Sequence, residues 1–402
     1  MIGEYGGVVV NNKKKVIIVG GCIAAKEAAN AIRSIDSSCN IIMISSEEYL
    51  PYYRPMLSRA IGQELPTSRL CLASKEWYEE NNIELILGTK VTQILPDKNT
   101  LITDKGNQYE YTHLLLATGA NNYIPLPEAM SKKGVLSIRT YDDILKLREY
   151  LPKTKNAIVV GGGLLGLETA WELQQQNIDV TIVELASHIL PKQIDAEAAQ
   201  FLSLHLEEKG INLLCNNSVA NILGEEYITA VECSNGHTFP CDLLIFSIGA
   251  NPNLELTKNT TIATEKGILV DHSMKTNIPN IYAAGDVAQN PHHTSGIWVP
   301  AMEMGAIAGY NIANKPSEYT PTHTSTMLTA FDIRVFSIGT ITNDPSLATE
   351  IIKDEGKTIF KKLFAKDNIV VGAILIGDIS QGTRLAKQLG TITLEDAMKL
   401  IE

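Results

Sequence analysis

Two glycine-rich stretches with matching spacing are the part of this chain best suited to chemistry. The second reads VVGGGLLGLETA over residues 159–170, with glycines at Gly161, Gly163 and Gly166. In a strand–loop–helix unit, the first glycine makes a tight turn, the second lets the backbone approach a pyrophosphate, and the third lets helix and strand pack closely. The phosphates then bind at the helix N-terminus, where free N–H groups and the helix dipole favour an anion.

An acidic residue completes this second stretch. Glu184 ends the apolar segment DVTIVE, residues 179–184, where an acid is expected to bind ribose hydroxyls. A carboxylate there would repel a 2′-phosphate, and no arginine follows in residues 185–188. The pattern therefore favours NADH over NADPH. A glycine-rich packing turn is the alternative, but here the strand, helix, second strand and acid are all in place, which a lone GxGxxG lacks.

The first stretch repeats the same unit. It reads KVIIVGGCIAAKEAANAI over residues 15–32, and Gly20 and Ala25 align with the first and third glycines of the second stretch. Cys22 stands where the second glycine should be. The chain therefore contains a βαβ dinucleotide unit twice, and only Cys22 compromises the first copy.

Cys22 is expected to be tolerated in a working cofactor site. A cysteine at a helix N-terminus could be a reactive thiol, but it would lie against the pyrophosphate, far from the ring that changes redox state. We expect it to tune or weaken cofactor binding, and a loop that no longer binds its cofactor is the alternative. The ribose acid of this copy is Glu47 or Glu48, just past the apolar residues 40–45, and we favour Glu47.

The composition is that of an ordinary globular protein of two or three domains. The 402 residues are 45% hydrophobic and 20% charged, and the net charge of −11 argues against nucleic acid or an anionic membrane as main partner. No apolar run reaches the roughly 20 residues of a membrane span. No N-terminal signal pattern is present, so we expect a cytoplasmic location and a flexible arm at residues 1–13. The six cysteines form no C-x-x-C pair, and we expect no metal site.

Three further segments indicate a flavin as well as a nicotinamide nucleotide. THLLLATGA (112–120) and LLIFSIGANPN (243–253) are predicted to be buried strands that end in glycine. TNIPNIYAAGDVA (276–288) is predicted to be a strand that leads into Gly285 and Asp286 at the start of a helix. Asp286 could be a simple helix cap, but in this combination we expect it to bind a hydroxyl of the flavin side chain.

With these segments in place, the chain resembles the FAD-dependent pyridine nucleotide–disulfide oxidoreductase superfamily. YLPYYRPMLSRAIG (49–62) and the second glycine stretch most resemble NADH:rubredoxin oxidoreductases and the flavin-and-NADH part of nitrite reductases. The resemblance covers roughly residues 14–320, and it continues more weakly through VGAILIGDISQGTRL (371–385).

This resemblance implies an α/β fold with two Rossmann-like FAD/NAD(P)-binding domains, one inserted in the other, plus a small C-terminal α+β domain. The expected domains are an FAD-binding domain at 14–120 and 245–320, an NADH-binding domain at 121–244 and a C-terminal domain at 321–402. The inserted layout agrees with the bare sequence, because the ATG segment and the IGANP segment bracket the second glycine unit.

The resemblance also implies electron transfer without a redox-active disulfide. Other members carry a redox cysteine directly after a Leu-Ser pair, whereas here Arg59 follows Leu57 and Ser58. We therefore expect an FAD-dependent NADH oxidoreductase that passes electrons through the flavin to rubredoxin, ferredoxin or another iron–sulfur protein. One alternative is an electron-transfer subunit docked into a larger redox complex, linked to carbon monoxide dehydrogenase or nitrite reductase and able to reduce NAD⁺. The other is a non-enzymatic relative that has lost FAD.

Site residues follow from the same resemblance. Glu168 points toward the nicotinamide in similar proteins, and Arg54 lies in the segment that passes near the flavin, so these two are the catalytic candidates. Glu168 could instead be a favourable acid in a first helical turn, and Arg54 could form a surface salt bridge. The residues expected to bind FAD or NADH are Gly20, Gly21, Cys22, Ala24, Ala25, Glu47, Arg54, Pro55, Ala117, Thr118, Gly119, Gly161, Gly163, Leu165, Gly166, Glu184, Gly249, Gly285, Asp286, Trp298 and Ala301.

GIWVPAMEMGAIAGYNI, residues 296–312, is expected to form the last helix of the FAD-binding domain. Its N-terminal N–H groups would face the flavin, and its small residues, including Gly305 and Gly309, would pack closely on the sheet. His292 and His293 precede it and are expected to be loop residues rather than metal ligands.

Overall fold

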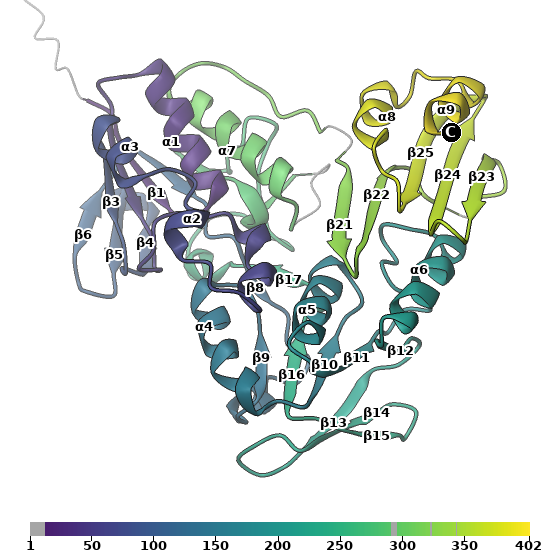
Figure 1. Ribbon diagram of the computed structural model, residues 1–402. Helices are drawn as coiled ribbons and strands as arrows, with labels where there is room; N and C mark the ends of the chain where they lie inside the picture. The colour runs from purple at the N-terminus through teal and green to yellow at the C-terminus, as the bar shows by residue number, and fades with distance from the viewer. Residues whose placement is uncertain (1–12, 291–295, 322–323, 343) are drawn as a thin grey trace, which may run out of the picture. The chain divides into compact units, whose positions relative to one another are not determined.

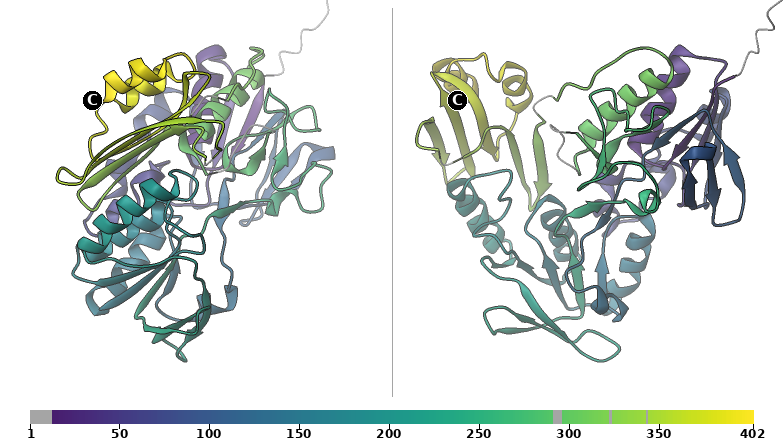
Figure 2. Two further views of the ribbon diagram at one scale, coloured as in Figure 1. Left: turned by 90° about the vertical axis from the view of Figure 1, so that its right-hand side faces the viewer. Right: turned by 180° about the vertical axis from the view of Figure 1, so that it is seen from behind.

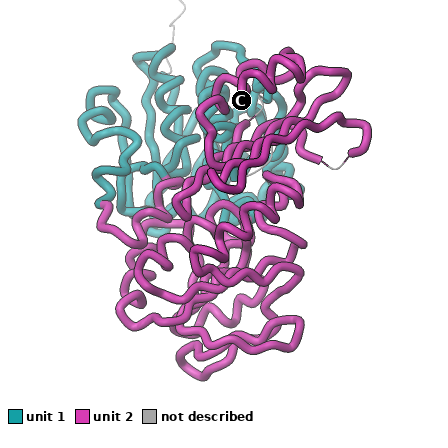
Figure 3. The backbone as a smooth tube through the Cα atoms, turned by 45° about the vertical axis from the view of Figure 1, so that its right-hand side comes forward, with its two compact units in different colours: residues 1–53, 66–121, 251–321 teal, residues 54–65, 122–250, 322–402 magenta. Residues whose placement is uncertain are grey.

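A computed structural model describes residues 13–290, 296–321, 324–342 and 344–402. The chain divides into two compact units (Figure 3). The first unit comprises residues 1–53, 66–121 and 251–321. The second comprises residues 54–65, 122–250 and 322–402. The expected N-terminal arm, apart from Lys13, and the pair His292 and His293 lie outside the described residues.

A five-stranded parallel sheet forms the centre of the first unit (Figure 1). Its order is β19-β7-β1-β2-β3. Strands β1, β2 and β7 are almost continuous runs of buried aliphatic residues, as expected when both faces of a parallel sheet are covered. The bounds are β1 (Lys15–Val19), β2 (Asn40–Ile44), β3 (Ile83–Ile86), β7 (His113–Leu116) and β19 (Ile281–Ala283), with helices α1 (Ile23–Ile35) and α7 (Trp298–Ile312).

Smaller elements complete this unit. An antiparallel sheet has the order β4-β5-β6, and β18 pairs with β20. Their bounds are β4 (Val91–Leu95), β5 (Thr100–Thr103), β6 (Gln108–Glu110), β18 (Ile268–Leu269) and β20 (Ala288–Gln289), and the short helices are α2 (Thr67–Leu70) and α3 (Lys75–Glu80). Two of the points at which the chain passes between the units lie in β8 (Ala120–Asn122) and β17 (Ala250–Pro252).

Helices α1 and α7 lie side by side in very close contact (Figure 1). A Cβ atom added at Gly305 would lie 2.2 Å from the carbonyl oxygen of Ala24, and one added at Gly309 would lie 2.4 Å from that of Ala28. The two glycines therefore let two helix backbones approach each other. The sequence predicted the close approach but placed it on the sheet, whereas these glycines face α1.

The second unit repeats the sheet of the first. Its order is β12-β11-β10-β16-β9, which corresponds strand for strand to β3-β2-β1-β7-β19. The bounds are β9 (Val135–Ser137), β10 (Asn156–Val160), β11 (Asp179–Val183), β12 (Asn212–Leu214) and β16 (Leu243–Phe246). Its helices are α4 (Tyr141–Tyr150), α5 (Leu164–Gln174) and α6 (Ala196–Glu208), and its antiparallel strands are β13 (Val219–Leu223), β14 (Ala230–Cys233) and β15 (Thr238–Pro240).

One expected boundary needs a correction. The start of the second FAD-binding segment was placed at residue 245, inside β16. That strand pairs with both β10 and β9 through Phe246. Because these ladder hydrogen bonds hold the whole strand in the second sheet, the boundary belongs after β16.

A mixed α and β layer at the end of the chain belongs to the second unit (Figure 2). Its antiparallel sheet has the order β21-β22-β25-β24-β23, and buried side chains of this sheet form an apolar core with α8 and α9. Helix α6 also contacts β24 and β25. The bounds are β21 (Thr326–Ala330), β22 (Ile333–Gly339), β23 (Ala348–Asp354), β24 (Ile359–Lys366), β25 (Ile369–Ile376), α8 (Gly382–Gln388) and α9 (Leu394–Ile401).

Within the described residues, every helix is too short or too polar to cross a membrane.

Candidate functional site

The first glycine of each loop is required by the fold. Gly20 has φ +139°, and an added Cβ would lie 2.1 Å from the carbonyl oxygen of Ala117. Gly161 has φ +111°, and its added Cβ would lie 2.3 Å from the carbonyl oxygen of Ser247. Ala117 and Ser247 follow the equivalent strands β7 and β16. Both loops therefore make the same tight turn, each against the equivalent strand of its own sheet.

The third position of the loop differs between the copies. An added Cβ at Gly166 would lie 1.9 Å from the carbonyl oxygen of Gly161, so only glycine fits there. The first copy has Ala25 at this position, and its side chain is fully buried against the sheet. The close contact between helix and loop therefore requires glycine at the third position in the second unit only.

The second position, which holds Cys22 in the first copy, is not required to be glycine by the fold. Cys22 has φ −134° and ψ −166°, an extended conformation that any residue adopts. Its counterpart Gly163 has φ −79° and ψ −176°, and a Cβ added there would meet no atom of the described residues within 4 Å. The fold itself therefore does not require glycine at this position, and Cys22 leaves the shape of the loop intact.

Helix N-termini provide the anion-binding part of both loops. Cys22 is the N-cap of α1 and Gly163 the N-cap of α5, and neither helix has a side-chain hydrogen bond to its cap. Leu165 lies in the first turn of α5. The N–H groups of these first turns can therefore bind a phosphate, and the extended backbone at both N-caps fits a dinucleotide.

The Glu184 carboxylate is held at the rim of the second loop. Its Oε2 accepts a hydrogen bond from the N–H of Gly162 at 2.6 Å, and Oε1 accepts one from the N–H of Ala186 at 2.7 Å. Each oxygen keeps a further lone pair, so the carboxylate can still accept bonds from two ribose hydroxyls.

The corresponding acid of the first loop lies two residues further along the chain. Ser45 occupies the position equivalent to Glu184, and its Oγ accepts a hydrogen bond from the N–H of Glu47 at 3.3 Å. Glu47 Oε2 in turn accepts a bond from the Tyr52 hydroxyl at 2.5 Å. An added Cβ at Gly21 would lie 2.3 Å from Ser45 Oγ, so the serine side chain fits only because residue 21 is glycine. Neither Ser45 nor Tyr52 was among the predicted site residues, although Tyr52 lies in the segment 49–62 that resembles the family.

Other predicted FAD-binding residues meet beside the first loop. An added Cβ at Gly285 would lie 3.0 Å from the Ala24 Cβ and 3.7 Å from the Ala301 Cβ. Asp286 Oδ1 accepts a hydrogen bond from the N–H of Gly296 at 3.1 Å. The Trp298 ring packs edge-on against the ring of Tyr53, with centroids 4.6 Å apart.

The ATG segment, residues 117–119, is hydrogen-bonded to Asn253, which follows β17. Thr118 Oγ1 donates to the carbonyl oxygen of Asn253 at 3.2 Å, and the N–H of Asn253 donates to the carbonyl oxygen of Gly119 at 2.9 Å. Gly249, which belongs to the second unit, has φ +100° and accepts a bond from the N–H of Tyr123 at 3.0 Å.

The two catalytic candidates both involve residues 54–65, which belong to the second unit. Arg54 and Pro55 lie in a 3₁₀ turn, and Arg54 Nη1 donates to the carbonyl oxygen of Arg139 at 2.7 Å. Ser58, which is buried, donates its hydroxyl to Glu168 Oε2 at 2.8 Å. Ser58 was not among the predicted site residues, and only its place in the motif before Arg59 could have pointed to it.

Two carboxyl groups on α5 face this segment. Glu168 and Glu172 are one helical turn apart, and a Cβ added at Gly62 would lie 2.8 Å from Glu172 Oε2. Burial raises the pKa of both carboxyl groups, and nearby Arg59 lowers them only in part. Both therefore hold a proton to a higher pH than an exposed glutamate does.

The thiols offer no pair for disulfide chemistry. All six cysteines are free. Burial raises the pKa of Cys39 to about 11 and that of Cys241 to about 12, and it also raises the pKa of Cys71, Cys215 and Cys233. These five thiols are therefore poor nucleophiles at neutral pH.

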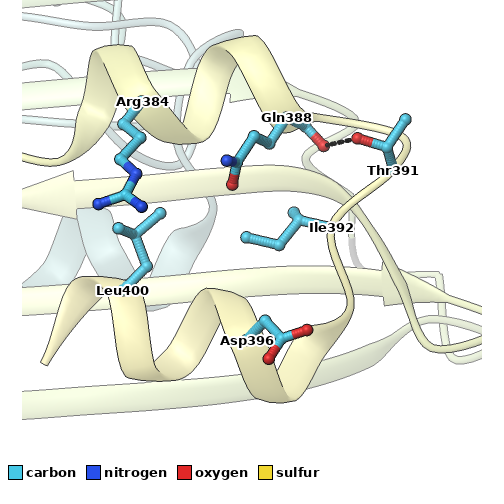
Figure 4. A pocket seen from close by; sticks show the side chains of 6 residues that line it. All are labelled: Arg384, Gln388, Thr391, Ile392, Asp396 and Leu400. Atoms are coloured by element: carbon cyan, nitrogen blue, oxygen red, sulfur yellow. Dashed lines mark hydrogen bonds between the residues drawn. The ribbon is translucent and has the colours of Figure 1, made fainter.

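A surface cavity of about 420 Å³ lies between α8 and α9 (Figure 4). Its lining residues are Arg384, Gln388, Thr391, Ile392, Asp396 and Leu400. Most of its polar side chains are exposed, and none is a predicted site residue.

Comparison with known families agrees with this geometry. Residues 14–305 match the family model described as pyridine nucleotide-disulphide oxidoreductase. The chain belongs to this family. A second model, the rubredoxin NAD⁺ reductase C-terminal domain, matches residues 325–391.

Individual members of the family resemble the chain over most of its length. The assimilatory nitrate reductase electron transfer subunit of Bacillus subtilis is 34% identical over 87% of this chain, which spans only 45% of that relative. The NADH-rubredoxin oxidoreductase of Clostridium acetobutylicum is 31% identical over 87% of this chain and 88% of its own. The crystal structure of a ferredoxin reductase from Rhodopseudomonas palustris superposes with a TM-score of 0.86, at 26% identity, over 96% of this chain and 97% of that one.

These comparisons confirm the resemblance and the α/β class with two Rossmann-like domains and a small C-terminal domain. The predicted oxidoreductase class, with FAD and NADH as cofactors, is that of the family. The assignment of individual residues to those cofactors stays a prediction.

Proposed function

We propose that the protein is an FAD-dependent NADH oxidoreductase that passes electrons to a one-electron carrier protein of the rubredoxin or ferredoxin type. The observation that carries this proposal is the presence of two dinucleotide loops with the same strand order, one in each unit. Each loop has its own acid, Glu47 in the first and Glu184 in the second. A single-cofactor dehydrogenase needs only one such loop.

In the first unit, the N–H groups of Gly21 and of the first turn of α1 would hold the pyrophosphate of FAD, and Glu47 would hold its adenosine ribose. In the second unit, the first turn of α5 would hold the pyrophosphate of NADH, and Glu184 would hold its ribose. FAD held there would supply the chemistry that links two-electron hydride transfer to one-electron transfer. The protein supplies the orientation of the two nucleotides.

The carboxyl group of Glu168 would hold or release a proton beside the nicotinamide of NADH bound to the second unit. The Ser58 hydroxyl donates a hydrogen bond to Glu168 Oε2 at 2.8 Å and so fixes the orientation of the carboxyl group. Burial keeps the pKa of Glu168 above its ordinary value. A buried carboxyl group with a raised pKa can accept the proton that is released once the carrier protein has taken the electrons. The poorly nucleophilic thiols support a route to the carrier that involves no disulfide.

A second candidate function is electron transfer within a larger complex. The relative from Bacillus subtilis is named an electron transfer subunit of nitrate reductase. The chemistry would be the same, and only the acceptor would differ. Co-purification with an enzyme subunit rather than a free carrier would favour this candidate.

The first test is an anaerobic absorption spectrum of the purified protein, before and after addition of NADH. Flavin bands that NADH bleaches, and that return on adding oxidised rubredoxin or ferredoxin, are expected. A colourless protein that takes up no added FAD would overturn the proposal. Bleaching that neither carrier reverses would remove the carrier part of it and leave the NADH-flavin part.

A further inference from the structure

A buried lysine joins the C-terminal sheet to helix α6. Lys362 lies in β24 with 8% of its surface exposed. Its ammonium nitrogen is 2.7 Å from Asp195 Oδ2 and 2.8 Å from Glu197 Oε2. Burial alone would lower the pKa of Lys362, but the two carboxylates outweigh it and hold the pKa above its ordinary value. The ammonium of Lys362 therefore keeps its charge at neutral pH, and it is the group that joins the two acidic side chains.

Asp195 ends the loop that begins at Glu184. Besides its bond to Lys362, Asp195 is the N-cap of α6, and its Oδ1 accepts a hydrogen bond from the N–H of Ala198 at 3.0 Å. The loop of residues 184–195 is therefore held at both ends. Its first residue is bonded to the glycine loop, and its last residue is bonded to the C-terminal sheet.

The middle of this loop is hydrogen-bonded to the glycine loop by Leu190, a residue with a strained backbone. Leu190 is fully buried and has φ +51°, a left-handed conformation that leucine adopts only when its surroundings impose it. Its N–H donates to the carbonyl oxygen of Gly162 at 2.9 Å. The N–H groups of Gln193 and Ile194 donate to the carbonyl oxygen of Leu190 at 2.8 and 3.0 Å. Gly162 is also the residue whose N–H binds Glu184.

We propose that Lys362 is a positioning residue for NADH binding, acting through Asp195 and the loop of residues 184–195 on the Glu184 carboxylate. The inference rests on the proposed role of the second loop in NADH binding. Loss of the ammonium would leave Asp195 buried without its partner and free the end of the loop. Leu190 could then leave its strained conformation, and Gly162 would lose the bond that helps to hold Glu184.

The neighbouring lysine offers a matched control. Lys361 is also buried, with 4% of its surface exposed, and it points to the opposite face of the sheet because alternate strand residues do. Its ammonium binds Asp378 Oδ2 at 2.9 Å and the carbonyl oxygen of Ile401 at the end of α9. Lys361→Met and Lys362→Met therefore each remove one buried, paired ammonium, but only Lys362 faces the loop.

The test compares these two variants by amide hydrogen exchange without nucleotide and by binding of NADH and NADPH. Lys362→Met is expected to speed exchange at the N–H groups of Ala186, Leu190, Gln193 and Ile194, and Lys361→Met is not. Lys362→Met should also raise the Kd and KM for NADH at least about fivefold with little change in kcat. Its preference for NADH over NADPH should fall because the carboxylate is less well placed. Lys362→Arg, which keeps the charge, should restore most of the affinity.

Equal loop exchange in Lys362→Met and wild type would overturn the inference, and so would the same change in Lys361→Met. Should Lys362→Met not fold, Asp195→Asn provides the test, because asparagine keeps the helix cap but removes the charge that pairs with Lys362. A wild-type protein that binds no NADH would refute the proposed function alone. The exchange experiment needs no nucleotide, so it would still decide whether Lys362 orders the loop.

Discussion

Cys22 shows how one residue can depart from a motif without disturbing the fold. Its backbone is extended rather than left-handed, and an added Cβ at its counterpart Gly163 meets no described atom within 4 Å. The thiol therefore leaves the loop undisturbed, and we expect any effect of it to fall on the bound cofactor. This geometry favours a working FAD site over the alternative in which the cofactor has been lost.

We predict that Cys22→Gly binds FAD about three to ten times more tightly, which corresponds to roughly 0.7–1.4 kcal/mol. The smaller residue lets the backbone come closer to the pyrophosphate. Titration of the apoprotein with FAD, followed by flavin fluorescence, measures the change. The reciprocal variant Gly163→Cys should weaken NADH binding and leave FAD affinity unchanged. Equal FAD affinity for Cys22→Gly and wild type would mean that the thiol does not lie beside the phosphates.

Glu168 contributes a pH dependence to stability. Burial raises its pKa in the folded protein above the ordinary 4.5, although Ser58 and Arg59 lower it in part. The folded protein thus binds the proton more tightly than the unfolded chain does. This stabilisation is complete below pH 4.5 and is lost as the pH rises through the folded-state pKa.

We predict that Glu168→Gln loses this pH dependence while keeping the hydrogen bond from Ser58. Relative to wild type, the free energy of unfolding of the variant should rise between pH 4.5 and the folded-state pKa, and stay level above it. Urea unfolding across that pH range measures it. The exposed Glu128→Gln is the control and should follow wild type. Parallel curves for Glu168→Gln and wild type would contradict the assignment.

At the scale of elements, the contact between α1 and α7 determines where the first cofactor loop lies. Helix α1 begins at the glycine loop, and α7 packs on it through Gly305 and Gly309. The predicted FAD-binding residues Ala24 and Ala301 lie on these two helices and meet at Gly285. The position of the loop therefore depends on the distance between the helices.

We predict that Gly305→Ala destabilises the protein by about 1–3 kcal/mol through overpacking, although alanine is the better helix former. The new Cβ would lie 2.2 Å from the carbonyl oxygen of Ala24, so α7 must move away from α1. FAD should also be bound more weakly. Thermal unfolding and the flavin content after purification measure the two effects. Ala306→Ser, at the half-buried neighbouring position, should change both only slightly.

At the scale of the whole molecule, the two units have the same sheet order but separate apolar cores. The core of the first unit surrounds β1 and β7, and that of the second includes side chains from β10 and β16. Each unit presents one glycine loop at the ends of its own parallel strands. The two nucleotide sites should therefore fail independently.

We predict that Gly20→Ala yields a protein without flavin that still binds NAD⁺, and that Gly161→Ala yields a yellow protein that NADH does not bleach. Both glycines have positive φ, and in both an added Cβ would meet a carbonyl oxygen at 2.1 or 2.3 Å. Absorption spectra and NAD⁺ titrations distinguish the variants. Loss of both ligands from either variant would show that the sites are not independent.

The sequence alone determined the two glycine loops and the helices that follow them, whereas the acid of each loop stays a prediction. These features depend on short-range requirements, such as a positive φ at Gly161 or an apolar strand before a turn. The periodicity of apolar residues and the spacing of glycines reflect such requirements within the roughly 30 residues of one βαβ unit. For this reason the repeat was visible before the two sheet orders were known.

Only the tertiary structure decided which distant side chains meet. Ser58 binds Glu168, Lys362 binds Asp195, and Gly305 packs on α1 rather than on the sheet. No local pattern marks these partners, because the pairing depends on how helices and sheets pack and on which side of an element faces its neighbour. In the sequence alone, Gly163 looks like a residue that the loop requires, and Cys22 looks like a residue that breaks this requirement. The structure shows that the position is open, because no described atom lies within 4 Å of a Cβ added at Gly163.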